Sequence, residues 1–505
     1  MDQPPRLRLS PLAIADAYKE SHSDQYPEGT TWVYSNLTPR RSRWPGMNTF
    51  VFFGLQAFLY DLNETFTRDF FEVPEEEAIG DFATFYREYF GSDNPRLCER
   101  IRRLHALGYL PLKLKALKEG AIVDHGVPVL TIENTHPDFF WLTNFVETWM
   151  SADLWHPSTS ATTAHYYRMN FDKYAAETSE QEWFADFQGH DFSMRGMPGV
   201  AAAMASGAGH LLSFKGSDTC PAIHWIRRNY GGVDEGELLA TSVPATEHSV
   251  MCAGSEEGEE ETFLRLLTKV YPGGIVSVVS DTWDFWKVVT EILPKLKPVI
   301  MARDGKLVIR PDSSPKTPVE ILIGDPDAPV GSPERIGLIE CLWNTFGGTE
   351  NAKGYRELDP HIGAIYGDSI TLAYQAAILA GLQAKGFSST NVVLGVGSYT
   401  YQYVTRDTHG IAIKATAVGR GWGEDFEIIP IFKDPKTDNS GKKSARGLLQ
   451  VVQSGGRYVL RDGVTREECD GGCLEPVYVD GKFVRRQTFS EVRRCLAEHA
   501  RARGS

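Results

Sequence analysis

The sequence lacks a long apolar run and an excess of basic residues. No stretch approaches the roughly 20 consecutive apolar residues that a membrane-spanning helix needs. Residues 1–10 contain prolines and arginines but no apolar core, so no secretory signal is expected and a soluble, cytoplasmic protein is predicted. The formal net charge of −14 argues against a nucleic-acid-binding protein, because such a protein needs a basic face.

Cysteine is also sparse. Seven cysteines scattered over 505 residues do not form a disulfide framework. The one close pair, Cys469 and Cys473, has one residue too many between its members for a redox Cys-x-x-Cys motif. No second pair or histidine cluster near it would complete a zinc site. This pair and the acidic run of residues 256–261 therefore receive no function from the sequence.

The central part of the chain has a β/α pattern. Apolar, β-branched runs alternate there with short polar or glycine-rich breaks and longer mixed segments, and the runs are residues 274–280, 307–310, 362–366 and 391–394. The runs are apolar throughout, as expected of parallel strands that are buried on both faces. Residues 180–250 continue the pattern, so one α/β barrel is predicted.

Polar residues follow each of these runs: Asp281, Asp312, Asp368 and Ser398. The carboxyl ends of parallel strands meet at one edge, where ligands bind, so these residues predict a shared site. Alternatively, each could cap the helix that follows it. Four such residues in succession favour the site.

The two ends of the chain differ from the centre, because short extended runs and turns dominate them. We predict an α/β fold: an irregular, TIM-like α/β barrel over residues 181–400, flanked by a β-rich α+β domain built from residues 1–180 and 401–505. A length of 505 residues suits this division, since single cores usually stop growing at roughly 250–300 residues.

An ordered set of motifs resembles the nicotinamide phosphoribosyltransferase family. The motifs are Asp16-Ala-Tyr18-Lys-Glu-Ser-His22, His190-Asp-Phe192-Ser-Met-Arg195, Phe214-Lys-Gly-Ser-Asp218, Ser242-Val-Pro-Ala-Thr-Glu247-His248 and Ile309-Arg310-Pro-Asp312-Ser313. They occur in the family's order and cover nearly the whole chain. The resemblance implies a transferase that joins nicotinamide to phosphoribosyl pyrophosphate (PRPP), giving nicotinamide mononucleotide for NAD salvage. It also implies a homodimer with shared active sites, Mg²⁺, and ATP as a co-substrate.

Phe192 and Tyr18 resemble the family's ring-stacking pair, with the tyrosine coming from the other subunit. Asp218 is expected to select the base, because its carboxylate accepts a hydrogen bond from the nicotinamide amide and repels the carboxylate of nicotinic acid. The alternative for Asp218 is a helix cap. Asp16 is expected near the pyrophosphate, beside Tyr18.

Several cations are candidates for the phosphates, because arginine suits bidentate contacts and lysine a point charge. They are Arg195, Arg310, Arg406, Lys414, Lys433 and Lys442. Lys442 and its neighbour Lys443 could equally be solvated surface residues. Gly367, Gly395, Gly397 and Ser398 are candidates for the 5′-phosphate, although the run Gly395-Val-Gly397-Ser398 lacks the consecutive glycines often seen in the family.

His248 is the candidate acceptor of a phosphoryl group from ATP, and Glu247 is predicted to orient its imidazole. Asp281, Asp312 and Asp368 are predicted to hold ribose hydroxyls or Mg²⁺, which prefers oxygen ligands. Two other functions stay open: a nicotinate phosphoribosyltransferase, and a non-catalytic metabolite-binding protein with the same fold.

Overall fold

The computed structural model describes residues 10–312, 316–367, 369–434 and 444–504. The chain divides into two compact units: a first unit of Met1–Thr162, Ile226–Asp234 and Thr405–Ser505, and a barrel unit of Thr163–Trp225 and Glu235–Val404. The first division falls at Thr162, inside the continuous helix α6 (Glu147–Thr178), rather than at the predicted 180, just after that helix ends. Ile226–Asp234 had been predicted to lie in the barrel.

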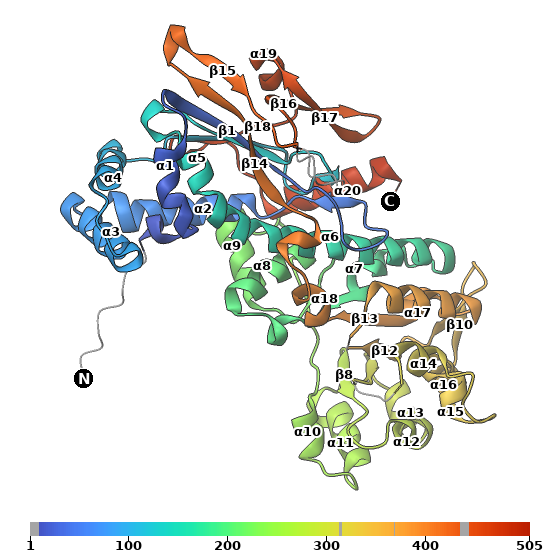
Figure 1. Ribbon diagram of the computed structural model, residues 1–505. Helices are drawn as coiled ribbons and strands as arrows, with labels where there is room; N and C mark the ends of the chain where they lie inside the picture. Colours follow the sequence, from blue (N-terminus) through green and yellow to red (C-terminus); the bar gives the residue numbers. More distant parts are fainter. Residues whose placement is uncertain (1–9, 313–315, 368, 435–443, 505) are drawn as a thin grey trace, which may run out of the picture. The chain divides into compact units, whose positions relative to one another are not determined.

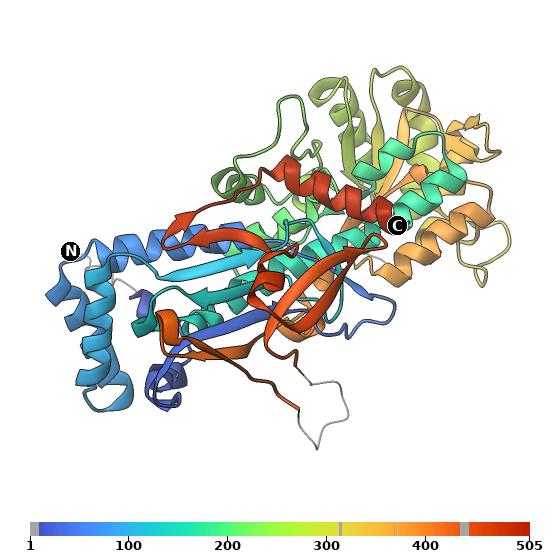
Figure 2. The same cartoon turned by 90° about the horizontal axis from the view of Figure 1, so that it is seen from above.

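The first unit contains a seven-stranded antiparallel sheet in the order β15-β14-β1-β5-β3-β18-β19. The sheet combines strands from both ends of the chain, drawn from blue to red in Figures 1 and 2. Its strands are β1 (Thr30–Thr38), β3 (Leu112–Ala116), β5 (Leu130–Asn134), β14 (Ala412–Arg420), β15 (Glu427–Pro430), β18 (Glu475–Val479) and β19 (Lys482–Phe483). The predicted β-rich domain built from both ends is therefore present.

Two small antiparallel pairs and several helices complete this unit. The pairs are β2 (Thr49–Val51) with β4 (Ile122–Asp124), and β16 (Leu448–Ser454) with β17 (Arg457–Val464). The helical elements are η1 (Pro11–Ala13), η2 (Ala17–Ser21), α1 (His22–Gln25), α2 (Leu55–Phe66), η3 (Thr67–Phe71), α3 (Glu75–Phe90), α4 (Pro95–Leu107), η4 (Pro137–Phe139), α5 (Leu142–Phe145), the start of α6, η10 (Arg406–Thr408), η11 (Gly423–Asp425), α19 (Arg466–Asp470) and α20 (Phe489–Arg503).

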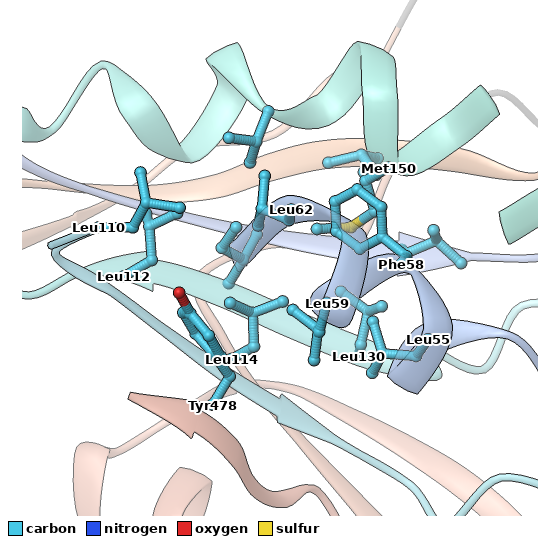
Figure 3. Packing of buried hydrophobic residues seen from close by; sticks show 14 of the residues in the cluster. Leu55, Phe58, Leu59, Leu62, Leu110, Leu112, Leu114, Leu130, Met150 and Tyr478 are labelled. Atoms are coloured by element: carbon cyan, nitrogen blue, oxygen red, sulfur yellow. The ribbon is translucent and has the colours of Figure 1, made fainter. Parts of the chain in front are cut away.

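The core of the first unit lies between α2 and the sheet (Figure 3). Leu55, Leu59 and Leu62 recur at the three- and four-residue spacing that places them on one face of α2. They lie in the same buried cluster as Leu114 of β3 and Leu130 of β5. Each fully buried leucine contributes about 1.5–3 kcal/mol relative to an exposed one, so this face fixes α2 on the sheet.

The barrel unit contains six parallel strands in the order β7-β6-β13-β12-β9-β8. They are β6 (Gly189–Asp191), β7 (Gly216–Ser217), β8 (Val276–Val279), β9 (Leu307–Arg310), β12 (Ile362–Tyr366) and β13 (Val392–Val396). All residues of β8 and β12 are buried, which explains their unbroken apolar runs. The strands predicted from those runs are confirmed.

The irregular segment 241–246 joins the two edges of this sheet. Ser217 N–H donates to the Thr241 carbonyl at 3.0 Å, which ties the segment to β7. Ser277 N–H donates to the Pro244 carbonyl at 2.9 Å, which ties it to β8. The parallel sheet is thereby closed into an irregular α/β barrel, as predicted.

Helices and one further strand pair surround the barrel: η5 (Glu182–Phe184), α7 (Ala185–Gln188), η6 (Met194–Gly196), α8 (Val200–His210), α9 (Pro221–Tyr230), α10 (His248–Cys252), α11 (Glu259–Arg265), η7 (Leu266–Val270), α12 (Phe285–Lys287), η8 (Val288–Ile292), α13 (Leu293–Met301), α14 (Pro318–Ile323), α15 (Pro333–Ile336), α16 (Leu338–Phe346), β10 (Gly348–Glu350), β11 (Arg356–Leu358), α17 (Leu372–Ala384), η9 (Ser389–Asn391) and α18 (Ser398–Gln402). Among the described residues of the whole chain, no helix is both long and apolar enough to span a membrane.

Candidate active site

Asp218 lies at the carboxyl end of β7, where two side chains hold it. Its Oδ1 accepts hydrogen bonds from His190 Nε2 at 2.9 Å and from Ser242 Oγ at 2.5 Å. Burial alone would raise the pKa of Asp218, but these hydrogen bonds and the charge of Arg310 bring it below its usual value. Asp218 is therefore a carboxylate near neutral pH. The sequence analysis did not identify His190 or Ser242 as its partners.

Phe192 follows β6 and places its ring beside the same carboxylate. The His190 and Phe192 ring centroids are 4.5 Å apart, with 36° between the planes. Gly395 of β13 makes room for the phenyl ring, since a Cβ there would lie 2.6 Å from Phe192 Cδ2. A Cβ at Gly367 would lie 2.8 Å from Asp312 Oδ1. Close packing against side chains thus explains both glycines.

A cavity of about 390 Å³ opens inside the barrel beside these residues. Phe192, Asp218, Ser242 and Arg310 line it near the carboxyl ends of the strands, and its walls include the aromatic residues Trp183, Phe184 and Phe187. Its size lies within the roughly 300–1,000 Å³ typical of small-molecule sites. These three aromatic residues were not predicted to line a site, because their one signal in the sequence was their spacing within five positions.

Arg310 and Asp312 form a pair at the end of β9. Arg310 Nε donates to Asp312 Oδ2 at 3.1 Å, and Nη2 donates to the Thr246 carbonyl at 2.9 Å. Burial raises the pKa of Asp312, nearby Asp281 adds to the rise, and Arg310 opposes it. Arg310 therefore supplies a fixed cation beside two carboxylates.

Asp281 is the centre of a second group of contacts. Its Oδ2 accepts a hydrogen bond from the backbone N–H of Asp312 at 2.8 Å, and its Oδ1 lies 3.4 Å from His248 Nε2. The Asp281 side chain is 3 % exposed and that of His248 is 48 % exposed, so a buried carboxylate supports an accessible imidazole. The following helix, α12, is capped by Asp284, so Asp281 is not its cap.

Glu247 does not orient His248 as predicted. The Glu247 carboxylate instead accepts a hydrogen bond from the Ser249 hydroxyl, and Asp281 occupies the place beside the imidazole. Glu247 and His248 are adjacent in the sequence but have different side-chain partners. The contact of His248 with Asp281 joins the start of α10 to the residues after β8, which lie more than 30 positions further along the chain.

For the other residues that were predicted for the barrel site, the structure shows fewer contacts that support a role in binding. Arg195, in η6, is exposed to solvent. Ser398 packs closely against Gly196, where a Cβ would lie 2.1 Å from Ser398 Oγ. A Cβ at Gly397 would meet no atom within 4 Å, so backbone there faces open space. Asp368 lies outside the described residues.

The first unit carries a second set of predicted residues around Tyr18, whose side chain is 60 % exposed. Burial raises the pKa of Tyr18, with contributions from Asp16 and Glu147, whereas Arg406 lowers it. Tyr18 therefore lies within electrostatic reach of both acids and of Arg406.

The cations of this unit also lie near one another. Burial lowers the pKa of the Lys414 ammonium, and the charges of Arg40, Arg406 and Lys433 lower it further. Arg40 was not predicted from the sequence, where it was one of many arginines without a distinguishing motif. Lys442 and Lys443 lie outside the described residues.

The carboxylates of Asp281 and Asp312 fit Mg²⁺ that is held jointly with a substrate. No group of three or more histidine, cysteine, aspartate or glutamate side chains suited to a metal occurs in the described parts of the chain. Mg²⁺ usually binds to one or two carboxylates together with substrate phosphates. Asp281 and Asp312 follow the neighbouring strands β8 and β9, and Asp281 raises the pKa of Asp312, so the two carboxylates lie close together.

Comparison with known proteins identifies the family of the chain. The nicotinate phosphoribosyltransferase family matches residues 187–469, and the N-terminal domain of nicotinamide phosphoribosyltransferase matches residues 11–97. A nicotinamide phosphoribosyltransferase of Acinetobacter baylyi is 47 % identical over 97 % of this chain and 98 % of its own length. One from Mycoplasma pneumoniae is 36 % identical over 88 % of this chain and 97 % of its own length.

Solved structures share the fold at low sequence identity. A nicotinate-nucleotide pyrophosphorylase from Pyrococcus furiosus has a TM-score of 0.59 at 13 % identity and covers 100 % of both chains. Human nicotinic acid phosphoribosyltransferase has a TM-score of 0.50 at 15 % identity, over 96 % of this chain and 93 % of its own. With motifs, fold and full-length relatives in agreement, the chain belongs to the nicotinamide phosphoribosyltransferase family of enzymes.

Proposed function

We propose that this enzyme transfers the phosphoribosyl group of PRPP to nicotinamide, giving nicotinamide mononucleotide and pyrophosphate for NAD salvage. The observation that carries the choice of base is the Asp218 carboxylate, fixed by His190 and Ser242 beside the Phe192 ring. Both hydrogen bonds use Oδ1. Oδ2 is then directed to a ligand amide, while a ligand carboxylate is repelled.

The Phe192 ring orients the pyridine so that its nitrogen faces ribose C1. Stacking of aromatic faces contributes about 0.5–1.5 kcal/mol beyond burial, which is enough to orient a ring but not to select it. In this proposal, Tyr18 of a second copy covers the other face of the pyridine, which requires a homodimer. The exposure of Tyr18 and its nearness to Arg406 support that role.

In the reaction, the bond from C1 to pyrophosphate breaks as the pyridine nitrogen bonds to C1, so negative charge grows on the leaving group. Arg310 stabilises this charge electrostatically, and in the proposed homodimer the cations Arg406, Lys414 and Lys433 of a second copy add to it. Asp312 and Asp281 hold the ribose hydroxyls and, when it is bound, Mg²⁺, which neutralises the pyrophosphate. A base held in line with C1 also removes much of the entropic barrier.

His248 is the proposed acceptor in a coupled hydrolysis of ATP. The terminal phosphoryl group would move from ATP to the imidazole, so that a P–O bond breaks, an N–P bond forms and ADP leaves. Asp281, 3.4 Å from Nε2, would accept a hydrogen bond from the N–H at that nitrogen of the neutral imidazole, so that Nδ1 takes the phosphoryl group. Water would later break the N–P bond and release phosphate, which completes the hydrolysis. The half-exposed ring supports this role, since a buried imidazole could not reach a nucleotide.

The test is a base competition with purified protein, PRPP and Mg²⁺, with nicotinamide and nicotinic acid offered in parallel and both mononucleotides quantified by chromatography. We expect nicotinamide mononucleotide as the main product. Higher turnover of nicotinic acid would instead identify a nicotinate phosphoribosyltransferase. Binding of the bases without turnover of either would identify a non-catalytic metabolite-binding protein.

A further inference from the structure

Tyr18 lies on a short helical element whose own hydrogen bonds are too few to fix its position. It belongs to η2, a 3₁₀ helix of five residues with no side-chain cap. Such short helices have poor hydrogen-bond geometry and depend on tertiary contacts. The Tyr18 ring is 60 % exposed, so its own packing does not supply those contacts.

Two anchors on either side of Tyr18 supply them. On one side, the Lys19 side chain is 4 % exposed, and its Nζ donates to Glu147 Oε2 at 2.6 Å and to the Asn144 carbonyl at 2.8 Å. The ammonium is almost fully withdrawn from water, so its position is set by this pair rather than by solvent.

On the other side, Asp16 and Thr148 form a reciprocal pair. Thr148 Oγ1 donates to Asp16 Oδ2 at 2.6 Å and accepts from the Asp16 backbone N–H at 3.3 Å. Glu147 and Thr148 are consecutive residues at the start of α6. One helix start therefore fixes both ends of the short segment that carries Tyr18.

We propose that Glu147 and Thr148 are positioning residues, which clamp residues 16–19 so that the Tyr18 ring is presented rigidly to the pyridine of the substrate. The inference rests on the proposed function, because it takes Tyr18 as a ring-stacking residue. Neither residue needs to touch the substrate. Their effect arises because a ring that must be ordered during binding contributes less than one that is already in place.

The test is a double-mutant cycle between Thr148→Val and Tyr18→Ala, with KM for nicotinamide, KM for PRPP, kcat and melting temperature measured for each protein. Thr148→Val keeps the shape of the side chain but removes both hydrogen bonds to Asp16. We expect it to raise KM for nicotinamide about tenfold in the wild-type background and less than about twofold in the Tyr18→Ala background, because coupled residues are not additive.

Three further variants separate positioning from simple stability. Thr148→Ser keeps the hydroxyl and should restore KM to near the wild-type value. Lys19→Met tests the second anchor and should also raise KM for nicotinamide. Thr488→Val is a matched control, because Thr488 caps α20 in the same unit through a hydrogen bond from Glu491 N–H. It should lower only the melting temperature.

Equal effects of Thr148→Val in both backgrounds, or a fall in melting temperature with unchanged KM, would overturn the inference and leave the proposed function standing. A wild-type protein that makes no nicotinamide mononucleotide would overturn both. The two failures are therefore distinguishable by the activity of the wild-type protein.

Discussion

The barrel unit and the first unit hold their candidate substrate-binding residues in different ways. In the barrel unit, Phe192, Asp218 and Arg310 lie at the ends of strands within a closed sheet, and hydrogen bonds from neighbouring strand ends fix the polar ones. In the first unit, Tyr18 and Arg406 lie on short 3₁₀ helices. A side chain at the end of a barrel strand is fixed by contacts with the neighbouring segments of the sheet. A side chain on a short helical turn needs additional contacts from another element, such as those from the start of α6.

The largest effect is expected from Arg310→Ala in the barrel. The substitution removes the cation that pairs with Asp312 and leaves two neighbouring carboxylates to repel the substrate phosphates. Steady-state kinetics should show kcat/KM for PRPP lowered by about 10²–10³, as is typical of a lost electrostatic contact in a transition state. Arg335→Ala is the control, since the exposed Arg335 lies outside the candidate site and its guanidinium donates to the Pro326 and Ala328 carbonyls. Equal losses in the two variants would contradict the role of Arg310.

A smaller effect is expected from His248→Ala. Transfer of label from radiolabelled ATP to the protein should disappear, and the ATP-stimulated rate should fall about tenfold, or about 1.4 kcal/mol in activation free energy. The rate without ATP should be unchanged. Asp281→Asn should weaken labelling without abolishing it, because the imidazole remains but loses its charged support. Full labelling of His248→Ala would refute the assignment.

Ser242→Ala tests how the barrel holds Asp218. The hydrogen bond from Ser242 helps to lower the pKa of Asp218 against the effect of burial, so its loss should raise that pKa. A carboxylate with a lowered pKa is charged above that pKa and loses its charge as the pH falls through it. The acid limb of the profile of kcat/KM for nicotinamide should therefore move to higher pH in the variant. An unchanged acid limb would show that Ser242 does not control Asp218.

The smallest effect is expected in the first unit, from Glu20→Gln on η2. Burial raises the pKa of Glu20 to about 8. Because this pKa is raised, the contribution of Glu20 to stability is complete below the unfolded value and is lost as the pH rises toward 8. The melting temperature of the wild type should thus fall over this range by a few degrees more than that of Glu20→Gln. Parallel curves for the two proteins would contradict burial of an uncharged Glu20.

The sequence predicted the parts of the fold that regular patterns specify. Largely apolar runs located β8, β9, β12 and β13, because strands of a parallel sheet that are mostly buried need mainly apolar residues. The segment 241–246, which closes the barrel, has no such run, and it pairs through isolated bridges around Pro244. The segment could therefore be assigned to the barrel only from the motif Ser242-Val-Pro-Ala-Thr-Glu247-His248.

The site was predictable by residue identity more than by geometry. Asp218, Phe192 and Arg310 could be named from strand ends and motifs, but their partners could not. His190 of β6 and Ser242 of the irregular segment 241–246 both reach Asp218, and Asp281 rather than Glu247 lies beside His248. Such contacts depend on the register of distant strands and on side-chain direction, which local spacing does not record.

The most direct test of the account is the ratio of amide to acid turnover in wild-type protein and in Asp218→Asn. The variant keeps the shape of the side chain but loses the charge that repels nicotinic acid. If Asp218 selects the base, the wild type strongly prefers nicotinamide, and the variant loses most of this preference by gaining turnover of the acid. An unchanged preference in a folded, active Asp218→Asn protein would contradict the claim that this carboxylate selects the substrate.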